Sequence, residues 1–309
     1  MEHPTTSSER FEFPPIMVLM ILVVAAMFGS FFGSSLAYLI AMSQGQDLVS
    51  LIASVQENMP LHTRNILRSI NLASHFMTFT FSVLMVVIFL YRKDWLRFLK
   101  LNRQPTATLL IASCFFMMAV FPVAQFAYWL NQQIPLPEWA SKMENSATGM
   151  LEGLMVMDSP WEFLFNLLVM AVLPAIGEEL MFRGIIQQKL EEQTKKPHLA
   201  IWVTAIIFSA IHFQFEGFLA RMVLGAGLGY LFFWSRNLWV PIAAHFLTNA
   251  LQIFVRYFFG AKVEEMQAQA EEISSVPWAS ALIGMILIFL TGQYLVKSKK
   301  EPEGQYDYK

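Results

Sequence analysis

Two adjacent glutamates, Glu178 and Glu179, interrupt a stretch that is otherwise apolar. Residues 161–176 before them are almost entirely hydrophobic, so the carboxylates lie about 25 Å along a helix at about 1.5 Å per residue. An ionised side chain near the centre of a bilayer costs about 2.5–3.5 kcal/mol, so such residues face a protein interior or a wet cavity and carry a function. Glu179 and Arg183 are four residues apart, acid first, which predicts an ion pair. Glu178 has no obvious local partner. The alternative is a helix that ends at the interface with a solvated pair of acids.

Two of the six histidines, His212 and His245, also lie inside or at the ends of apolar stretches. His245 and Asn249 are one helical turn apart and share a face. A lone histidine in a membrane helix commonly bonds a neighbouring helix, so each alone favours a structural role. Glu178 and His212 are equally distant from a turn near Lys195, which places both about 20 Å deep on antiparallel helices at about 1.5 Å per residue. We therefore expect a carboxylate, two imidazoles and an amide to share one inward-facing cavity.

The other four histidines are expected at the surface or at the membrane interface. They are His3, His62, His75 and His198.

Three motifs, in this order, together resemble those of a known family. They are Glu178-Glu179 with Arg183 four residues after Glu179, Phe208 with His212, and His245 with Asn249. This set is similar to the motifs of the CAAX-protease and bacteriocin-processing family of intramembrane endopeptidases, which includes the Ras-converting prenyl-protein protease. The resemblance covers roughly residues 174–249, and no motif residue departs from the family pattern.

The resemblance implies hydrolysis of a peptide bond in a membrane-associated substrate, either CAAX-like or another lipidated or hydrophobic peptide. It implies that Glu178 is the general base and that His212 helps to hold and polarise the water. His245 and Asn249 would donate hydrogen bonds to the oxyanion.

Several alternatives remain beside this interpretation. By the same resemblance, the Glu179–Arg183 pair would orient the motif helix. A serine or cysteine nucleophile is not indicated, because neither Cys114 nor Ser209 has the sequence signature of a nucleophile with an oriented base. A glutamate with two histidines is also an accepted set of catalytic zinc ligands. The sequence has no H-E-x-x-H helix, so we expect no metal cofactor, with zinc as the alternative.

Outside catalysis, the polar cluster is compatible with the ion or proton relay of a transporter. A non-catalytic binding or immunity protein of the same family is a further alternative.

The elements that must position these residues are membrane helices. Of 309 residues, 56% are hydrophobic and 14% charged, and the mean hydropathy is +0.48. This composition predicts an all-α, polytopic membrane protein with about eight transmembrane helices. No basic arm indicates a nucleic-acid partner. The apolar windows of spanning length are residues 16–42, 70–91, 107–130, 161–187, 199–213, 218–235, 238–259 and 276–296.

Basic residues divide the connecting loops into two groups. They are concentrated in residues 92–103, 189–196, 236 and 297–300. The loops that are acidic or poor in Lys and Arg are 47–68, 135–158 and 260–275. We therefore expect both termini in the cytoplasm, with a first span that is retained rather than cleaved. Short loops favour a bacterial plasma membrane. The expected segments are a tail (1–15), three helices with outer loops (16–160), a catalytic core (161–259) and a last loop, span and tail (260–309).

The sixth window contains the small residues Gly225-Ala226-Gly227-Leu228-Gly229, which include GxxxG spacing. This pattern predicts close helix packing inside a monomer rather than a dimer contact. Arg221 on the same helix either meets a substrate carboxylate or lies near the outer interface.

Overall fold

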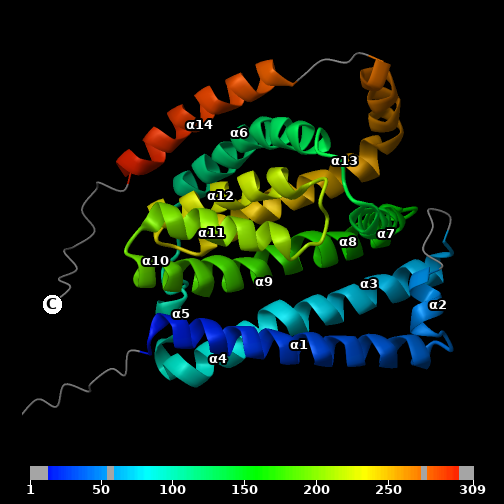
Figure 1. Ribbon diagram of the computed structural model, residues 1–309, viewed down its shortest axis with the longest axis horizontal. Coiled ribbons are helices and arrows are strands. Elements are labelled where there is room, and N and C mark those ends of the chain that lie inside the picture. The colour runs from blue at the N-terminus through cyan, green and yellow to red at the C-terminus, as the bar shows by residue number, and fades with distance from the viewer. Residues whose placement is uncertain (1–12, 54–58, 273–276, 299–309) are drawn as a thin grey trace, which may run out of the picture.

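The computed structural model describes residues 13–53, 59–272 and 277–298 as a bundle of helices (Figure 1). No strand occurs among these described residues, which confirms the all-α prediction. The first helices are α1 (Pro15–Ser43), α2 (Leu48–Ala53), α3 (Leu61–His75), η1 (Phe76–Phe81), α4 (Ser82–Tyr91), η2 (Arg92–Asp94), α5 (Trp95–Phe98), α6 (Ala107–Gln132) and α7 (Glu138–Met155). The others are α8 (Pro160–Asn166), η3 (Leu167–Val172), α9 (Leu173–Met181), η4 (Phe182–Gln187), α10 (Gln188–Thr194), α11 (Pro197–Ala210), α12 (Phe218–Ser235), α13 (Trp239–Glu272) and α14 (Trp278–Ser298).

Six continuous helical segments of the described chain are long and apolar enough to cross a membrane. They are Pro15–Ser43, Leu61–Phe98, Ala107–Gln132, Pro160–Thr194, Phe218–Ser235 and Trp278–Lys297. The two other predicted windows fall on the shorter apolar helix α11 and on α13. The chain is thus an integral, polytopic membrane protein. His3, most of the predicted N-terminal tail and the end of the C-terminal tail lie outside the described residues. The predicted acidic loop 260–275 is wrong as far as residue 272, because α13 continues as a helix to Glu272; the side chains after Gly260 lie outside the description.

The second span begins at Leu61, earlier than the predicted residue 70. Arg64 and Arg68 interrupt the apolar pattern, but both side chains are buried and bond to Glu162 on α8, at 2.8 and 2.6 Å. Because the carboxylate compensates the two guanidinium groups, the helix continues through them. The predicted outer loops 47–68 and 135–158 also contain the helices α2 and α7.

The helices form successive layers (Figure 1). α1 packs on the α3–η1–α4 span, η1 packs on α9, and α11, α12, α6 and α14 follow in turn. The close approach of α1 depends on small residues, since Gly29 and Gly33 are buried. Across this contact Ser82 on α4 donates to the carbonyl of Ala25 at 2.9 Å. The candidate residues of α9 are therefore in the interior of the bundle.

Two spans contain π-helical segments near the candidate residues: η1 in the second, and η3 and η4 on either side of α9 in the fourth. Pro174 provides a reason for η3. It has no N–H and so cannot bond the carbonyl of Met170, four residues earlier. The side-chain amide of Asn249 donates to that carbonyl instead, at 3.2 Å. A proline in α9 thus ties the third motif to the first.

The small residues of α12 contact the motif helix inside the chain, as the sequence predicts. Nη2 of Arg183 donates to the carbonyl of Gly225 at 2.6 Å, and Nε2 of Gln187 donates to that of Gly229 at 3.0 Å. A Cβ atom at Gly229 would lie 2.9 Å from Oε1 of Gln187, so only glycine permits this approach.

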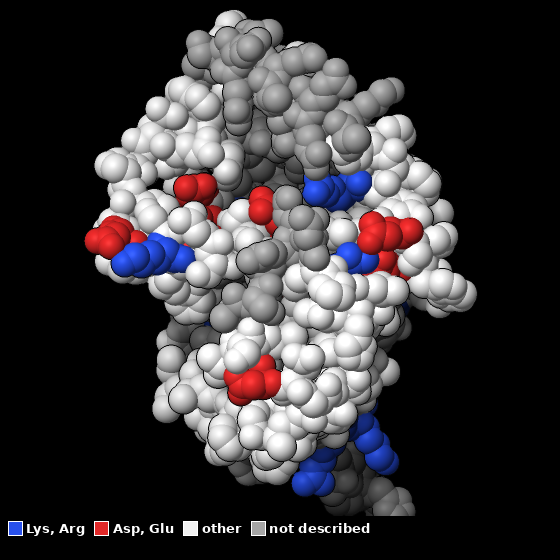
Figure 2. Space-filling view, turned by 90° about the vertical axis from the view of Figure 1, so that its right-hand side faces the viewer, with Lys and Arg blue, Asp and Glu red and all other residues white. Residues whose placement is uncertain are grey.

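The loops predicted to be basic meet at one end of the bundle, on the left in Figure 1. Arg236 bridges to Glu191 at 2.5 Å, the amide of Leu238 donates to the carbonyl of Lys100 at 3.1 Å, and Gln188 donates to that of Phe98 at 3.1 Å. The opposite end is seen in Figure 2, where the visible charged side chains form a few small groups, some with acidic and basic residues side by side, on an otherwise uncharged surface.

Candidate active site

Glu178 lies on α9 and is 6% exposed. Its Oε1 atom is 3.1 Å from Nε2 of His75, and its Oε2 atom is 3.9 Å from Nε2 of His245. The two imidazoles come from α3 and α13, so three helices meet at this carboxylate. Glu178 and His245 are both buried among these helices.

Glu179 and Arg183 form the predicted ion pair, and both side chains are 0% exposed. Nη1 of Arg183 donates to Oε1 of Glu179 at 2.6 Å. The same oxygen is 2.8 Å from Nδ1 of His245. An ionised carboxylate only accepts hydrogen bonds, so Nδ1 of His245 carries the proton in this contact. Glu179 therefore turns Nε2 of His245 toward Glu178.

His212 lies in the turn after α11, which ends at Ala210. It is therefore at the end of the apolar helix, although the predicted window extends to residue 213. Its Nδ1 atom is 2.7 Å from the carbonyl of Phe208. Because a carbonyl only accepts, Nδ1 carries the proton and Nε2 is left for another partner. The Phe208 ring packs edge-on against both histidines. Its centre lies 5.1 Å from that of the His212 ring and 6.2 Å from that of the His245 ring.

Asn249 is half-buried on α13, one turn from His245. Its bond to Met170 uses one of the two N–H groups of its amide. The second N–H group is available for another acceptor. Asn249 thus lies next to the cluster. Its hydrogen-bond partner is the backbone of Met170 in the fourth span and not the side chain of Glu178.

The prediction that His75 lies at the surface is wrong. Its side chain is 13% exposed and contacts Glu178. The helix does not end there, because η1 continues it into α4, and His75 lies about 21 Å from the start at Leu61 at about 1.5 Å per residue. The only sequence signal for burial was the position of His75 inside the apolar window 70–91, and this signal does not identify Glu178 as the partner. His62 and His198 are exposed, as predicted.

Arg221 has a role that the sequence analysis did not identify. Its guanidinium donates to both the side chain (3.0 Å) and the backbone carbonyl of Gln214. It therefore closes the turn between α11 and α12, which follows His212.

A second brace on this turn comes from α7. The carboxylate of Glu144 is buried and accepts from the backbone amides of Phe215 and Glu216. The Trp139 ring also packs edge-on against Phe215 at 5.3 Å. Because α7 lies in a predicted loop, its apolar pattern gave no signal for this contact.

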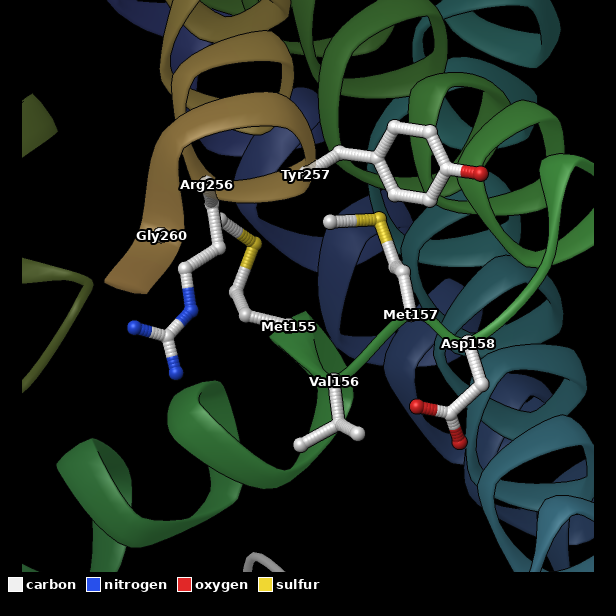
Figure 3. A pocket seen from close by; sticks show the side chains of 7 residues that line it. All are labelled: Met155, Val156, Met157, Asp158, Arg256, Tyr257 and Gly260. Carbon is white, nitrogen blue, oxygen red and sulfur yellow. The ribbon is translucent and has the colours of Figure 1, made fainter. Parts of the chain in front are cut away.

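A pocket of about 230 Å³ lies apart from the cluster, where α7 and α8 adjoin α13 (Figure 3). It is lined by Met155, Val156, Met157, Asp158, Arg256, Tyr257 and Gly260. None of these is a predicted site residue.

A catalytic metal ion would need several nitrogen, oxygen or sulfur ligands that converge on one point. Among the described residues, no group of three or more His, Cys, Asp and Glu side chains is arranged to hold one. Nδ1 of His212 and Nδ1 of His245 are both engaged by protein acceptors. Such bonds from Nδ1 are also usual for histidines that bind zinc through Nε2, so zinc stays the alternative to metal-free chemistry.

Fold and site together define a polytopic helical membrane protein with a buried glutamate held between histidines. Residues 160–251 match the family described as type II CAAX prenyl endopeptidase, Rce1-like. This match confirms the resemblance that the three motifs indicate, and it extends from the start of α8 into α13.

Two proteins of Bacillus subtilis (strain 168) are similar to the chain over 90 residues each. "Uncharacterized protein YpbD" is 30% identical across 28% of this chain and 43% of its own length. "Putative membrane peptidase YdiL" is 28% identical across 29% of this chain and 36% of its own length. The similarity therefore spans less than half of each relative. No solved structure matches the chain.

Proposed function

We propose that the chain is an intramembrane endopeptidase in which Glu178 activates a water molecule. The observation that carries the proposal is the buried carboxylate of Glu178, which lies with His245 in the segment that matches the protease family and is contacted from outside that segment by His75. The substrate is a membrane-associated peptide that is CAAX-like, otherwise lipidated or hydrophobic. All the side chains involved come from one chain, so a monomer suffices.

In the proposed reaction Glu178 takes a proton from water, and the water oxygen attacks the peptide carbonyl carbon. The unprotonated Nε2 of a neutral His212 accepts the second water hydrogen and so fixes the water. Glu178 then gives its proton to the amide nitrogen as the carbon–nitrogen bond breaks. The immediate products are a carboxylic acid, which keeps the second water proton, and an amine; transfer of that proton to the amine leaves a carboxylate and an ammonium group, and Glu178 returns to its ionised starting state.

The oxyanion is stabilised by His245 and by the second amide N–H of Asn249. His245 donates from Nε2 only as an imidazolium, since Nδ1–H already points at Glu179. Two ionised glutamates and one arginine leave a single negative charge. A protonated His245 neutralises it, which supports this role for the residue.

No step of this mechanism passes through a metal, and zinc is the alternative. The proposal therefore predicts that the purified protein contains no metal and that it still cleaves its substrate in the presence of a strong chelator. Loss of cleavage in chelator and its return with zinc would instead support the metallopeptidase.

The central test is cleavage by purified protein in liposomes. Mixed prenylated and unprenylated membrane peptides are supplied, and products are identified by mass spectrometry. We expect products from the wild type and none from Glu178→Gln, because the amide cannot accept the proton. The matched control is Glu138→Gln, whose carboxylate is exposed on α7 and pairs with Lys142. It should retain wild-type activity.

Activity of folded Glu178→Gln at the wild-type rate would contradict the proposed role of Glu178. No product from the wild type on any peptide of the panel would favour the non-catalytic alternatives, a binding protein or a transporter.

A further inference from the structure

His75 contacts Glu178 from α3, outside the segment that matches the peptidase family. We infer that His75 is a positioning residue for Glu178: its Nε2–H group holds Oε1, so that Oε2 is presented to the water. This inference rests on the proposed function of Glu178. It extends the site to the N-terminal layer of the bundle.

The two oxygens of Glu178 have different surroundings. Oε1 is at hydrogen-bonding distance from Nε2 of His75, 3.1 Å. Oε2 is 3.9 Å from Nε2 of His245, which is too long for a direct hydrogen bond. The oxygen that faces the motif histidine His245 is thus the one that remains available to a water. Anchoring Oε1 fixes the side-chain torsions of Glu178, as the third member of a catalytic triad fixes its base.

The His75 ring is itself held in place. It stacks on Phe79 of η1 with the ring centres 4.5 Å apart and the planes inclined by 26°. A Cβ atom at Gly177 would lie 3.3 Å from Cε1 of His75 and 2.8 Å from Oγ1 of Thr80. The glycine before Glu178 therefore lets η1 approach α9 closely enough for the histidine to reach the carboxylate.

The protonation of His75 follows from its contacts. Nε2 faces an acceptor and must carry a proton when Glu178 is ionised. Nδ1 is buried and has no hydrogen-bond partner among the described residues. An imidazolium would bury a charged N–H donor at Nδ1 without an acceptor, which costs more than an unmet lone pair. The contacts therefore favour the neutral ring with its proton on Nε2.

Two amide variants test this assignment in the liposome assay. Glutamine places its amide nitrogen near the position of Nε2, whereas the shorter asparagine places it near that of Nδ1. We expect His75→Asn to lower kcat by about 10²-fold, the cost of a misplaced catalytic group, with little change in KM. His75→Gln should recover most of that loss. His198→Gln is the control, because His198 lies at the exposed start of α11, and it should match the wild type.

Equal kcat values for His75→Asn, His75→Gln and the wild type would overturn the inference. Equal, full loss in both variants would overturn it too, since the position of the donor would then be irrelevant. If His75→Asn does not fold, ¹⁵N NMR of the histidine ring in the wild-type protein decides. We expect a protonated Nε2 and an unprotonated Nδ1, and the opposite tautomer or an imidazolium would reject the assignment.

The wild type and Glu178→Gln are measured first in the same assay. Products from the wild type alone, with His75 variants at the wild-type level, would reject only the role of His75. Absence of products from the wild type would reject the proposed function, and the NMR measurement would still test the His75–Glu178 bond.

Discussion

Individual carboxylate oxygens have distinct partners in this site. Oε1 of Glu179 accepts from both Arg183 and His245, while Oε1 of Glu178 is bonded to His75. Adjacent positions on a helix differ by about 100° in direction, so one glutamate faces α12 and α13 while the other reaches α3. The bonds to Arg183 and to Nδ1 of His245 therefore fall on Glu179, which supports the proposed role of Glu178.

The buried Glu179–Arg183 pair predicts a large effect on stability. Arg183→Met leaves a buried carboxylate without its guanidinium, which typically costs about 3–5 kcal/mol. The measurement is reversible unfolding in detergent micelles. Arg97→Met is the matched control, because the Arg97–Asp94 pair is exposed and its loss costs about 0–1 kcal/mol. Equal stabilities of the two variants would contradict the structural role of the buried pair.

At this scale the sequence predicts what local spacing determines. Glu179 and Arg183 are one turn apart, so their ion pair follows from helix geometry. The His75–Glu178 contact joins residues 103 positions apart. It depends on how two layers pack, and no local pattern encodes that. The role of Arg221 in the α11–α12 turn was missed for a related reason, since its partner Gln214 lies outside any helix.

Among the elements, α9 is unusual because π-helical segments flank it on both sides. Such segments widen the turn locally and occur frequently at functional sites. The one before α9 coincides with the carbonyl that Pro174 cannot engage, and Asn249 uses that carbonyl as its anchor. The position of Asn249 in the third motif thus depends on the backbone carbonyl that Pro174 leaves without an N–H donor in the helix of the first motif.

Pro174→Ala tests this dependence. The new backbone N–H would compete with Asn249 for the carbonyl of Met170, so we expect kcat to fall by about tenfold or more as the amide loses its position. Stability should be unchanged or higher, because proline inside a helix costs about 3 kcal/mol. Both quantities are measured on the same preparation. The control is Pro122→Ala, which removes a proline inside α6, and an equal fall of kcat there would contradict the argument.

Helix positions were largely predictable because apolar windows of spanning length are a strong signal. The residues at which the helices begin and end were less predictable. The second span begins early, since Arg64 and Arg68 are compensated from α8, and α11 ends before His212. The π-helical segments were not predicted, because they leave the hydrophobic pattern unchanged.

At the scale of the whole molecule, the N-terminal layer is more than a membrane anchor. The family match begins at residue 160, yet α3 contributes His75 to Glu178 and binds α8 through Arg64 and Arg68. We propose that both termini are cytoplasmic and that the membrane is a bacterial plasma membrane. The basic loops at one end of the bundle and the relatives from Bacillus subtilis support this proposal.

Thiol labelling in intact cells tests the orientation. In a Cys114→Ser background, Lys196→Cys lies between α10 and α11 and Lys142→Cys lies on α7; both native side chains are exposed. An impermeant maleimide should label the cysteine at position 142 from outside and reach that at 196 only after lysis. The reverse pattern would contradict the proposed topology.

The most direct measurement of the central claim is the liposome assay run in ¹⁸O-labelled water with hydroxylamine present. If Glu178 activates water for direct attack, the wild type should place one ¹⁸O atom in the new carboxylate of the N-terminal fragment and form no hydroxamate. Glu178→Gln should give neither product. A hydroxamate would reveal an acyl-enzyme and a protein nucleophile, and labelled product from Glu178→Gln at the wild-type rate would remove Glu178 from the chemistry. Either result would contradict the account.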